Sequence, residues 1–264
     1  MIAFLAAGAL LASGTPAAVN LSEAAHAIEA NRLVQARRML ADAIASGQRG
    51  PDVDHLLADL AFADQRWAEA QARYTQLLEA KPNDARSAER AGIATLMVGD
   101  LRSASIFIRR AISFGHASWQ GWNALGVLCD LERDWDGADA AYATADELSP
   151  DRAEVLNNHG WSLILRGEWA IAAQILEKAA QLDPKSSRIA NNLDLARAAV
   201  ESDLPKRRKG ETDSGFAARL NDAGVAAEQR GDRARAIAAF SRALAVSDAW
   251  NARAANNLAR LQPQ

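Results

Sequence analysis

Cysteine is nearly missing from this sequence, whose 264 residues include a single one, Cys129. One cysteine cannot form an internal disulfide, and it cannot supply the thiolate cluster of a structural zinc site. The four histidines fall at unrelated spacings, so nothing brings them together on a metal. Phosphate-cradling glycine loops and the Gly-x-Ser-x-Gly nucleophile motif are missing as well. We therefore expect no metal, no cofactor and no catalytic site.

Residues that favour strands are sparse too. The sequence has two tyrosines against seven tryptophans, and it is rich in alanine, a composition that favours helices over sheets. Charge of one sign does not dominate, because the formal net charge is −3. Such a chain has no strong field to attract nucleic acid or an anionic membrane. These features predict an all-α protein that does not bind nucleic acid.

The one long apolar run covers residues 2–12 and is followed by small residues up to Ala18. The run is too short to span a bilayer. It fits a secretory signal peptide over residues 1–18, cleaved near Ala17 or Ala18. Since no Lys or Arg precedes the run, the alternatives are an apolar lead-in helix and a start codon assigned too late. Cleavage predicts a periplasmic protein, and the lack of a cysteine after the run predicts that any membrane association is indirect.

An internal period of 34 residues organises the rest of the sequence. Small residues recur at this interval in two registers, Gly92, Gly126 and Gly160 in one and Ala70, Ala104, Ala138 and Ala172 in the other. Four residues after the alanines, a third register holds bulky side chains such as Tyr142 and Leu176. We interpret the small residues as close contacts between paired antiparallel helices and the bulky ones as core. Glycine-acid pairs and prolines mark the turns.

One stretch carries the whole pattern, with Trp122-x-x-Leu125-Gly126, Ala138, Tyr142, Ala145 and Pro150. This combination resembles the tetratricopeptide-repeat (TPR) family. The resemblance implies an α-solenoid, a right-handed superhelix of antiparallel helix pairs. It also implies a protein that is not an enzyme and that binds other proteins or extended peptide segments.

The period divides residues 17–201 into five repeats and a capping helix. The repeats are 17–50, 51–84, 85–118, 119–152 and 153–186, and the cap is 187–201. Proline, glycine and the basic run Lys206-Arg207-Arg208-Lys209 predict a solvated linker over 202–214. Residues 215–264 then hold a sixth repeat, 217–250, and a short C-terminal cap helix.

In a TPR solenoid the first helix of each pair lines the concave groove. Asparagines recur there in two neighbouring registers, Asn123, Asn157 and Asn191 in the first and Asn158 and Asn192 in the second. Because asparagine donates and accepts, such a row can pair with the backbone of an extended peptide. A structural role for these asparagines is the alternative.

Apolar and charged residues are expected to face the same groove. The apolar set is Phe62, Ile93, Val127 and Trp161. Trp161 is large and amphipathic, which suits an anchor for a partner side chain, although packing is the alternative here too. Acidic Asp59 and basic Arg86 make the groove mixed in sign, which argues against a clamp built solely for a carboxylate terminus.

The whole arrangement resembles the TadD-type proteins of tight-adherence (Flp) pilus assembly. The shared features are an export-like start, five contiguous repeats, the run Asn157-Asn158-His159-Gly160-Trp161, and a helix with Asn191-Asn192-Leu193 before a separated last repeat. The resemblance implies a periplasmic, outer-membrane-associated factor that helps to assemble the pilus secretin and secretion-system components. Members are commonly lipoproteins, and this sequence has no lipobox cysteine. The alternatives are a generic periplasmic or cytoplasmic TPR adaptor and the substrate-binding arm of an enzyme complex.

Overall fold

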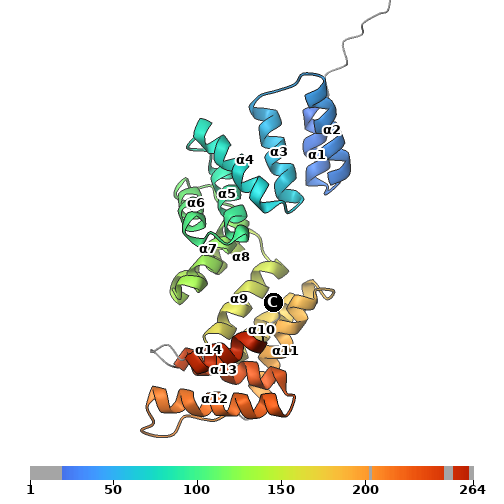
Figure 1. Cartoon of the computed structure of the whole chain (residues 1–264). Helices are drawn as coiled ribbons and strands as arrows, with labels where there is room; N and C mark the ends of the chain where they lie inside the picture. Colours follow the sequence, from blue (N-terminus) through green and yellow to red (C-terminus); the bar gives the residue numbers. More distant parts are fainter. Residues whose placement is uncertain (1–19, 202–203, 247–251, 262–264) are drawn as a thin grey trace, which may run out of the picture. The chain divides into compact units, whose positions relative to one another are not determined.

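The computed structural model describes residues 20–201, 204–246 and 252–261, and within these ranges it contains fourteen α-helices and no strand (Figure 1). The all-α prediction is therefore confirmed. The predicted signal peptide over residues 1–18 lies outside the described residues. None of the described helices is both long enough and apolar enough to cross a membrane.

The chain forms two compact units, and the first spans Met1–Asp100. Its helices are α1 (Leu21–Glu29), α2 (Leu33–Ala45), α3 (Pro51–Ala63), α4 (Trp67–Ala80) and α5 (Ala85–Val98). Each helix packs against the next along the chain, and α1 also contacts α3. This arrangement places α1 and α3, the first helices of the first two predicted repeats, side by side.

The second unit spans Leu101–Gln264. Its helices are α6 (Leu101–Ser113), α7 (Trp119–Glu132), α8 (Trp135–Leu148), α9 (Ala153–Leu165), α10 (Trp169–Leu182), α11 (Ser187–Glu201), α12 (Asp213–Gln229), α13 (Arg233–Val246) and α14 (Ala252–Leu261). Helix α13 contacts both α9 and α11. The predicted sixth repeat therefore packs on the fifth repeat and its cap.

A residue with a left-handed backbone conformation (positive φ) occupies one register in each of the six predicted repeats. It lies at the turn between the two helices of the pair. These residues are Asn31, Gln65, Gly99, Arg133, Gly167 and Gly231, with φ between 55° and 95°. A glycine adopts this conformation without strain, whereas a residue with a Cβ does so at a cost. The common backbone turn explains why the sequence places glycine here in three repeats.

Close helix packing explains the first-helix glycines. A Cβ built on Gly126 would lie 2.5 Å from the Tyr142 ring, and one on Gly160 would lie 2.5 Å from Leu176 Cγ. Gly224 stands in the same relation to Phe240, whose ring atom Cε1 would be 2.5 Å away. The prediction that Gly126 and Gly160 lie at close contacts between paired helices is confirmed. The side chain that faces each glycine is the bulky residue, and not the alanine four residues before it as expected.

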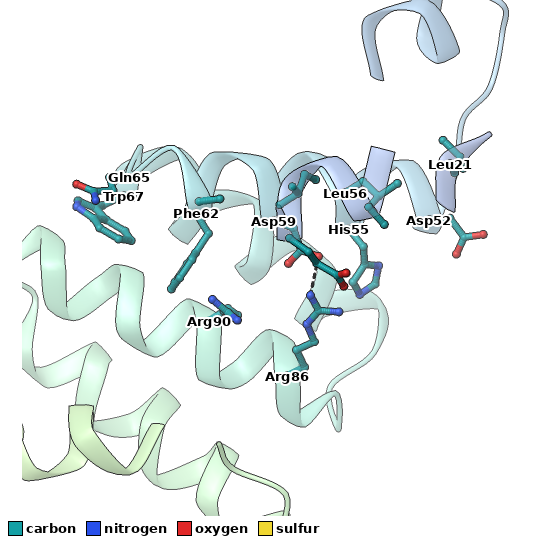
Figure 2. Close-up of a pocket in the computed structure, with 14 residues that line it drawn as sticks. Leu21, Asp52, His55, Leu56, Asp59, Phe62, Gln65, Trp67, Arg86 and Arg90 are labelled. Carbon is teal, nitrogen blue, oxygen red and sulfur yellow. Dashed lines mark hydrogen bonds and ion pairs between the residues drawn. The ribbon is translucent and has the colours of Figure 1, made fainter. Parts of the chain in front are cut away.

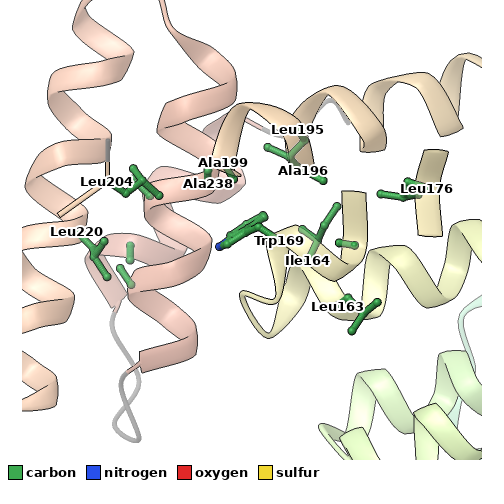
Figure 3. Packing of buried hydrophobic residues seen from close by; sticks show 14 of the residues in the cluster. Leu163, Ile164, Trp169, Leu176, Leu195, Ala196, Ala199, Leu204, Leu220 and Ala238 are labelled. Carbon is green, nitrogen blue, oxygen red and sulfur yellow. The ribbon is translucent and has the colours of Figure 1, made fainter. Parts of the chain in front are cut away.

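An extended apolar cluster of the second unit joins repeats on both sides of the linker (Figure 3). It combines Ile164 of α9, Trp169 of α10 and Ala196 of α11 with Leu220 of α12 and Ala238 of α13. Burial of this much apolar surface is the main force that holds α12 and α13 against the preceding repeats.

Candidate functional site

The first unit contains a hollow of about 630 Å³, which we call the N-terminal hollow (Figure 2). Three first helices supply most of its wall. These residues include Leu21 and Ile28 of α1, His55, Leu56, Asp59 and Phe62 of α3, and Arg86 and Arg90 of α5. Residues three and four apart share one face of a helix, so the periodic spacing along α3 and α5 directs these side chains to one side.

Asp59 holds the charged centre of the N-terminal hollow in place. Arg86 Nη2 lies 2.8 Å from Asp59 Oδ2, and the buried Tyr74 hydroxyl donates to Asp59 Oδ1. Burial, reinforced by the neighbouring Asp59 carboxylate, raises the pKa of the Tyr74 phenol far above its ordinary value. Tyr74 therefore stays protonated as a donor, and the mixed sign expected from Asp59 and Arg86 takes the form of an ion pair.

Arg90 is the cation of the N-terminal hollow that has no acidic partner among the described residues. Its guanidinium carbon lies 4.4 Å from the centroid of the Phe62 ring, and its buried Nε atom has no hydrogen-bond acceptor. A guanidinium above an aromatic face is held in position by a cation–π interaction. Arg90 thus presents unused N–H donors beside an apolar wall. A ligand with an acidic group next to an apolar side chain can bind to both.

A hydrogen-bonded network fixes the edge of the N-terminal hollow. His55 Nε2 lies 3.2 Å from Asp84 Oδ2, and Asp84 accepts from the Ser87 backbone N–H (3.2 Å) and hydroxyl (2.9 Å). Burial by itself raises the pKa of Asp84, but the hydrogen bonds from Ser87 and His55 outweigh it and lower the pKa overall. The ionised Asp84 caps the first turn of α5 and so sets the position of Arg86 and Arg90.

The predicted asparagine ladder lies in the second unit and is bonded internally. Asn158 Nδ2 donates to Asn123 Oδ1 (3.1 Å), and Asn192 Nδ2 donates to Asn157 Oδ1 (2.9 Å). Asn157 Nδ2 also donates to Asn158 Oδ1 (3.3 Å). The asparagines of one first helix therefore bond those of the next, across α7, α9 and α11.

Burial corrects one expectation about this ladder. Asn123 and Asn157 are only 7% and 2% exposed, whereas Asn191 is exposed. The expectation that the first register lies on the surface is therefore wrong for the first two, because each accepts a side-chain hydrogen bond from the following repeat. Asn257 Nδ2 of the C-terminal cap helix donates in the same way to Asn221 Oδ1 of the sixth repeat (3.0 Å). Contact between these asparagines and a bound peptide stays a prediction.

The predicted apolar groove residues divide between different surroundings. Phe62 lines the N-terminal hollow. Ile93 is half-buried elsewhere in the first unit. Val127 packs on the cluster around Tyr142, and Trp161 packs on the cluster that the sixth repeat shares. The structure therefore joins Phe62 to a residue that sequence reasoning missed, Arg90, although its spacing of four from Arg86 on the same helix face was a usable signal.

Comparison with known proteins supports the fold. No protein-family model and no curated protein matches the sequence. Among solved structures, PilW, a widely conserved type IV pilus biogenesis factor, aligns with TM-score 0.52 and 14% identity over 90% of this chain and 96% of its own. A tetratricopeptide repeat protein from Parabacteroides merdae aligns with TM-score 0.51 and 15% identity over 91% and 96%. PilF from Pseudomonas aeruginosa gives TM-score 0.50 and 13% identity over 91% and 93%. At such identities the likeness concerns the fold, which is the TPR fold.

Proposed function

We propose that the protein is a non-catalytic scaffold that binds other proteins through the N-terminal hollow. The observation that carries this proposal is the unpaired Arg90 guanidinium held 4.4 Å from the Phe62 ring centroid in a hollow of about 630 Å³. An extended segment fits such a site by placing an apolar side chain against Phe62 and a neighbouring carboxylate on Arg90. The Asp59–Arg86 ion pair leaves Arg90 as the cation available to that carboxylate.

We further propose that the partners belong to a pilus assembly system. Two considerations support this: the sequence resemblance to TadD-type tight-adherence proteins, and the shared fold with PilW, which is a pilus biogenesis factor. In this proposal the chain acts in the periplasm and assists assembly of the pilus secretin and secretion-system components. The alternative is a generic TPR adaptor, which would use the same hollow but would not prefer pilus components as partners.

The test uses the purified full chain and the purified pilus secretin of the same organism. Phe62→Ala and Arg90→Gln should each weaken binding about 5-fold to 30-fold, the effect of losing a buried anchor or a charge-assisted contact. Matched controls lie on the exposed surface of α2, where Val34 is 80% exposed and Arg38 is exposed. Val34→Ala and Arg38→Gln should bind like the unmodified chain.

Two results would contradict the proposal. If Phe62→Ala and Arg90→Gln bind the secretin as well as the controls do, the N-terminal hollow is not the binding site. If no secretin or secretion-system component binds the unmodified chain, the pilus assignment fails and the generic adaptor is the better description.

A further inference from the structure

A second hollow of about 610 Å³ lies in the second unit beside the linker, and we call it the linker hollow. The start of α10, the end of α11, the linker and α13 form its wall. The wall includes Trp169, Ile171, Val200, Leu204, Lys206 and Arg242. None of these residues belongs to the N-terminal hollow.

The linker hollow has an apolar floor and an apolar rim. Trp169 and Leu204 are 5% and 4% exposed, so they form the floor. Ile171 and Val200 lie on adjacent helices and are 48% and 51% exposed, so they form the rim. Exposed apolar groups that surround a hollow favour contact with an apolar group of a partner.

A buried donor without an acceptor stands in the wall of the linker hollow. The indole Nε1 of Trp169 is buried and has no hydrogen-bond partner among the described residues. A Cβ built on Gly167, which also lines the hollow, would lie 3.8 Å from this nitrogen. Figure 3 shows Trp169 lying between Ile164 and Ala238. Because buried polar groups are almost always hydrogen-bonded, this donor points to an acceptor supplied from outside.

Two cations complete the linker hollow. Neither Lys206 nor Arg242 forms an ion pair in the described part of the chain; Arg242 lies 5.8 Å from the Phe216 ring centroid. The acidic residue of the wall, Glu168, has Oε1 3.4 Å from Nε of Arg166, which also pairs with Asp139, so one carboxylate of the wall stands against the two cations. The local charge available to a ligand is therefore positive.

We infer that the linker hollow binds an acidic, apolar segment of a partner protein. An apolar side chain of the segment packs on Trp169, Ile171 and Val200. An adjacent Asp or Glu carboxylate lies between Lys206 and Arg242, and an oxygen of the segment accepts the Trp169 N–H. A concave site with a buried donor suits a polypeptide segment better than a flat bilayer. The inference rests on the proposed protein-binding function but uses a different surface.

The probe is a blocked tetrapeptide, acetyl-Leu-Asp-Leu-Asp-amide, titrated into the full chain labelled with ¹⁵N at tryptophan. Trp169→Phe removes and so assigns one indole resonance. We expect that resonance to shift with a saturable curve and a Kd on the order of 1 mM, as befits a short peptide. The matched probe acetyl-Leu-Asn-Leu-Asn-amide should bind at least about 10-fold more weakly, because it lacks the charges.

Charge variants locate the carboxylate. Lys206→Gln and Arg242→Gln should each weaken binding of the acidic peptide by about 3-fold to 10-fold. Arg253→Gln, which removes an exposed arginine of α14 outside the hollow, should leave binding unchanged. Phe62→Ala and Arg90→Gln should also leave the Trp169 shift unchanged, so failure of the N-terminal hollow and failure of the linker hollow give different results.

Several results would overturn the inference. The Trp169 resonance could stay unmoved, it could move equally with the two peptides, or Lys206→Gln and Arg242→Gln could bind like Arg253→Gln. Vesicles of phosphatidylcholine with one-fifth phosphatidylglycerol serve as the competing probe. Vesicle binding that depends on Lys206 and Arg242, without any peptide-induced shift, would identify an anionic lipid surface instead.

Discussion

Tyr142 occupies the space that a side chain on Gly126 would need. Its ring atom Cε1 would lie 2.5 Å from an added Cβ, and its hydroxyl donates to the buried Asp130 carboxylate at 2.7 Å. The ring cannot retreat without losing that hydrogen bond. Gly126→Ala should therefore lower the free energy of unfolding by about 1–3 kcal/mol, measured by urea denaturation.

A double-mutant cycle controls this prediction. In the background of Tyr142→Ala the added methyl group meets no ring, so Gly126→Ala should cost much less there. An equal cost in both backgrounds would show that helix–helix crowding is not the reason for the glycine.

At the residue scale, the sequence predicted more of the packing than of the site. The recurrence of Gly126 and Gly160 with Tyr142 and Leu176 predicted a close helix contact and a bulky core residue in each repeat, although the alanines were expected to face the glycines where Tyr142 and Leu176 do. Arg90 has no such repetition, because its role in the site depends on a contact with Phe62, which lies on another helix. Sequence spacing places both side chains on inward faces but does not specify that contact.

Among the elements, the first helices α7, α9 and α11 are joined by asparagine side chains. Asn157→Ala removes the acceptor of the Asn192 amide and the donor to Asn158. The groups left unpaired are part-buried, so we expect a loss near the lower end of the 1–3 kcal/mol that an unsatisfied buried group costs, about 1 kcal/mol. Thermal melting of the purified variant measures it.

The exposed Asn191 supplies the matched control, because Asn191→Ala should change the unfolding free energy by less than about 0.5 kcal/mol. A normal melt for Asn157→Ala together with weaker partner binding would instead support the peptide-contacting role. The sequence left these two roles open, since a row of asparagines at one register suits either. Which role applies depends on how far neighbouring first helices are shifted along their axes, because this shift decides whether the asparagines reach one another. The sequence of a single repeat does not specify that shift.

The start of α5 gives a pH-dependent prediction. Asp84 caps this helix through Ser87, so Asp84→Ala should lower the unfolding free energy by about 1 kcal/mol at neutral pH. The folded-state pKa of Asp84 is lowered from its ordinary value of 3.8. The stabilisation is therefore present above that value and is lost as the pH falls through the lower folded-state pKa.

Denaturation at several pH values measures this difference between the unmodified chain and Asp84→Ala. The two stabilities should converge as the pH falls below about 3.8. A difference that stays constant from neutral to acidic pH would mean that the carboxylate charge does not contribute to the cap.

For the whole molecule, the all-α fold was predictable because the 34-residue period persists along most of the sequence. The packing of α13 on α9 and α11 was not. It depends on the path of a linker with no repeat pattern and on apolar matching between Trp169 and residues such as Ala238. For Trp161 the sequence left a groove anchor and a packing role open, and the structure packs it against the cluster that the sixth repeat shares.

Export is the prediction that belongs to the whole chain. The apolar run and the small residues that follow it predict removal of the segment that ends at Ala17 or Ala18 and a periplasmic mature protein. Cell fractionation with N-terminal sequencing of the purified protein tests this. Recovery of an uncleaved chain in the cytoplasmic fraction would contradict it.

The asparagine bonds between first helices have a consequence for how such a chain can change its length. Each bond runs from a donor in one repeat to an acceptor in the repeat before it. A tandem duplication of residues 153–186 would bring a new donor for Asn157 and a new acceptor for Asn192, so every bond would be remade. An insertion within a first helix that is not a whole number of repeats would shift the register and leave a side-chain amide unmatched. The ladder therefore favours evolution by whole-repeat duplication and opposes shorter insertions within the first helices.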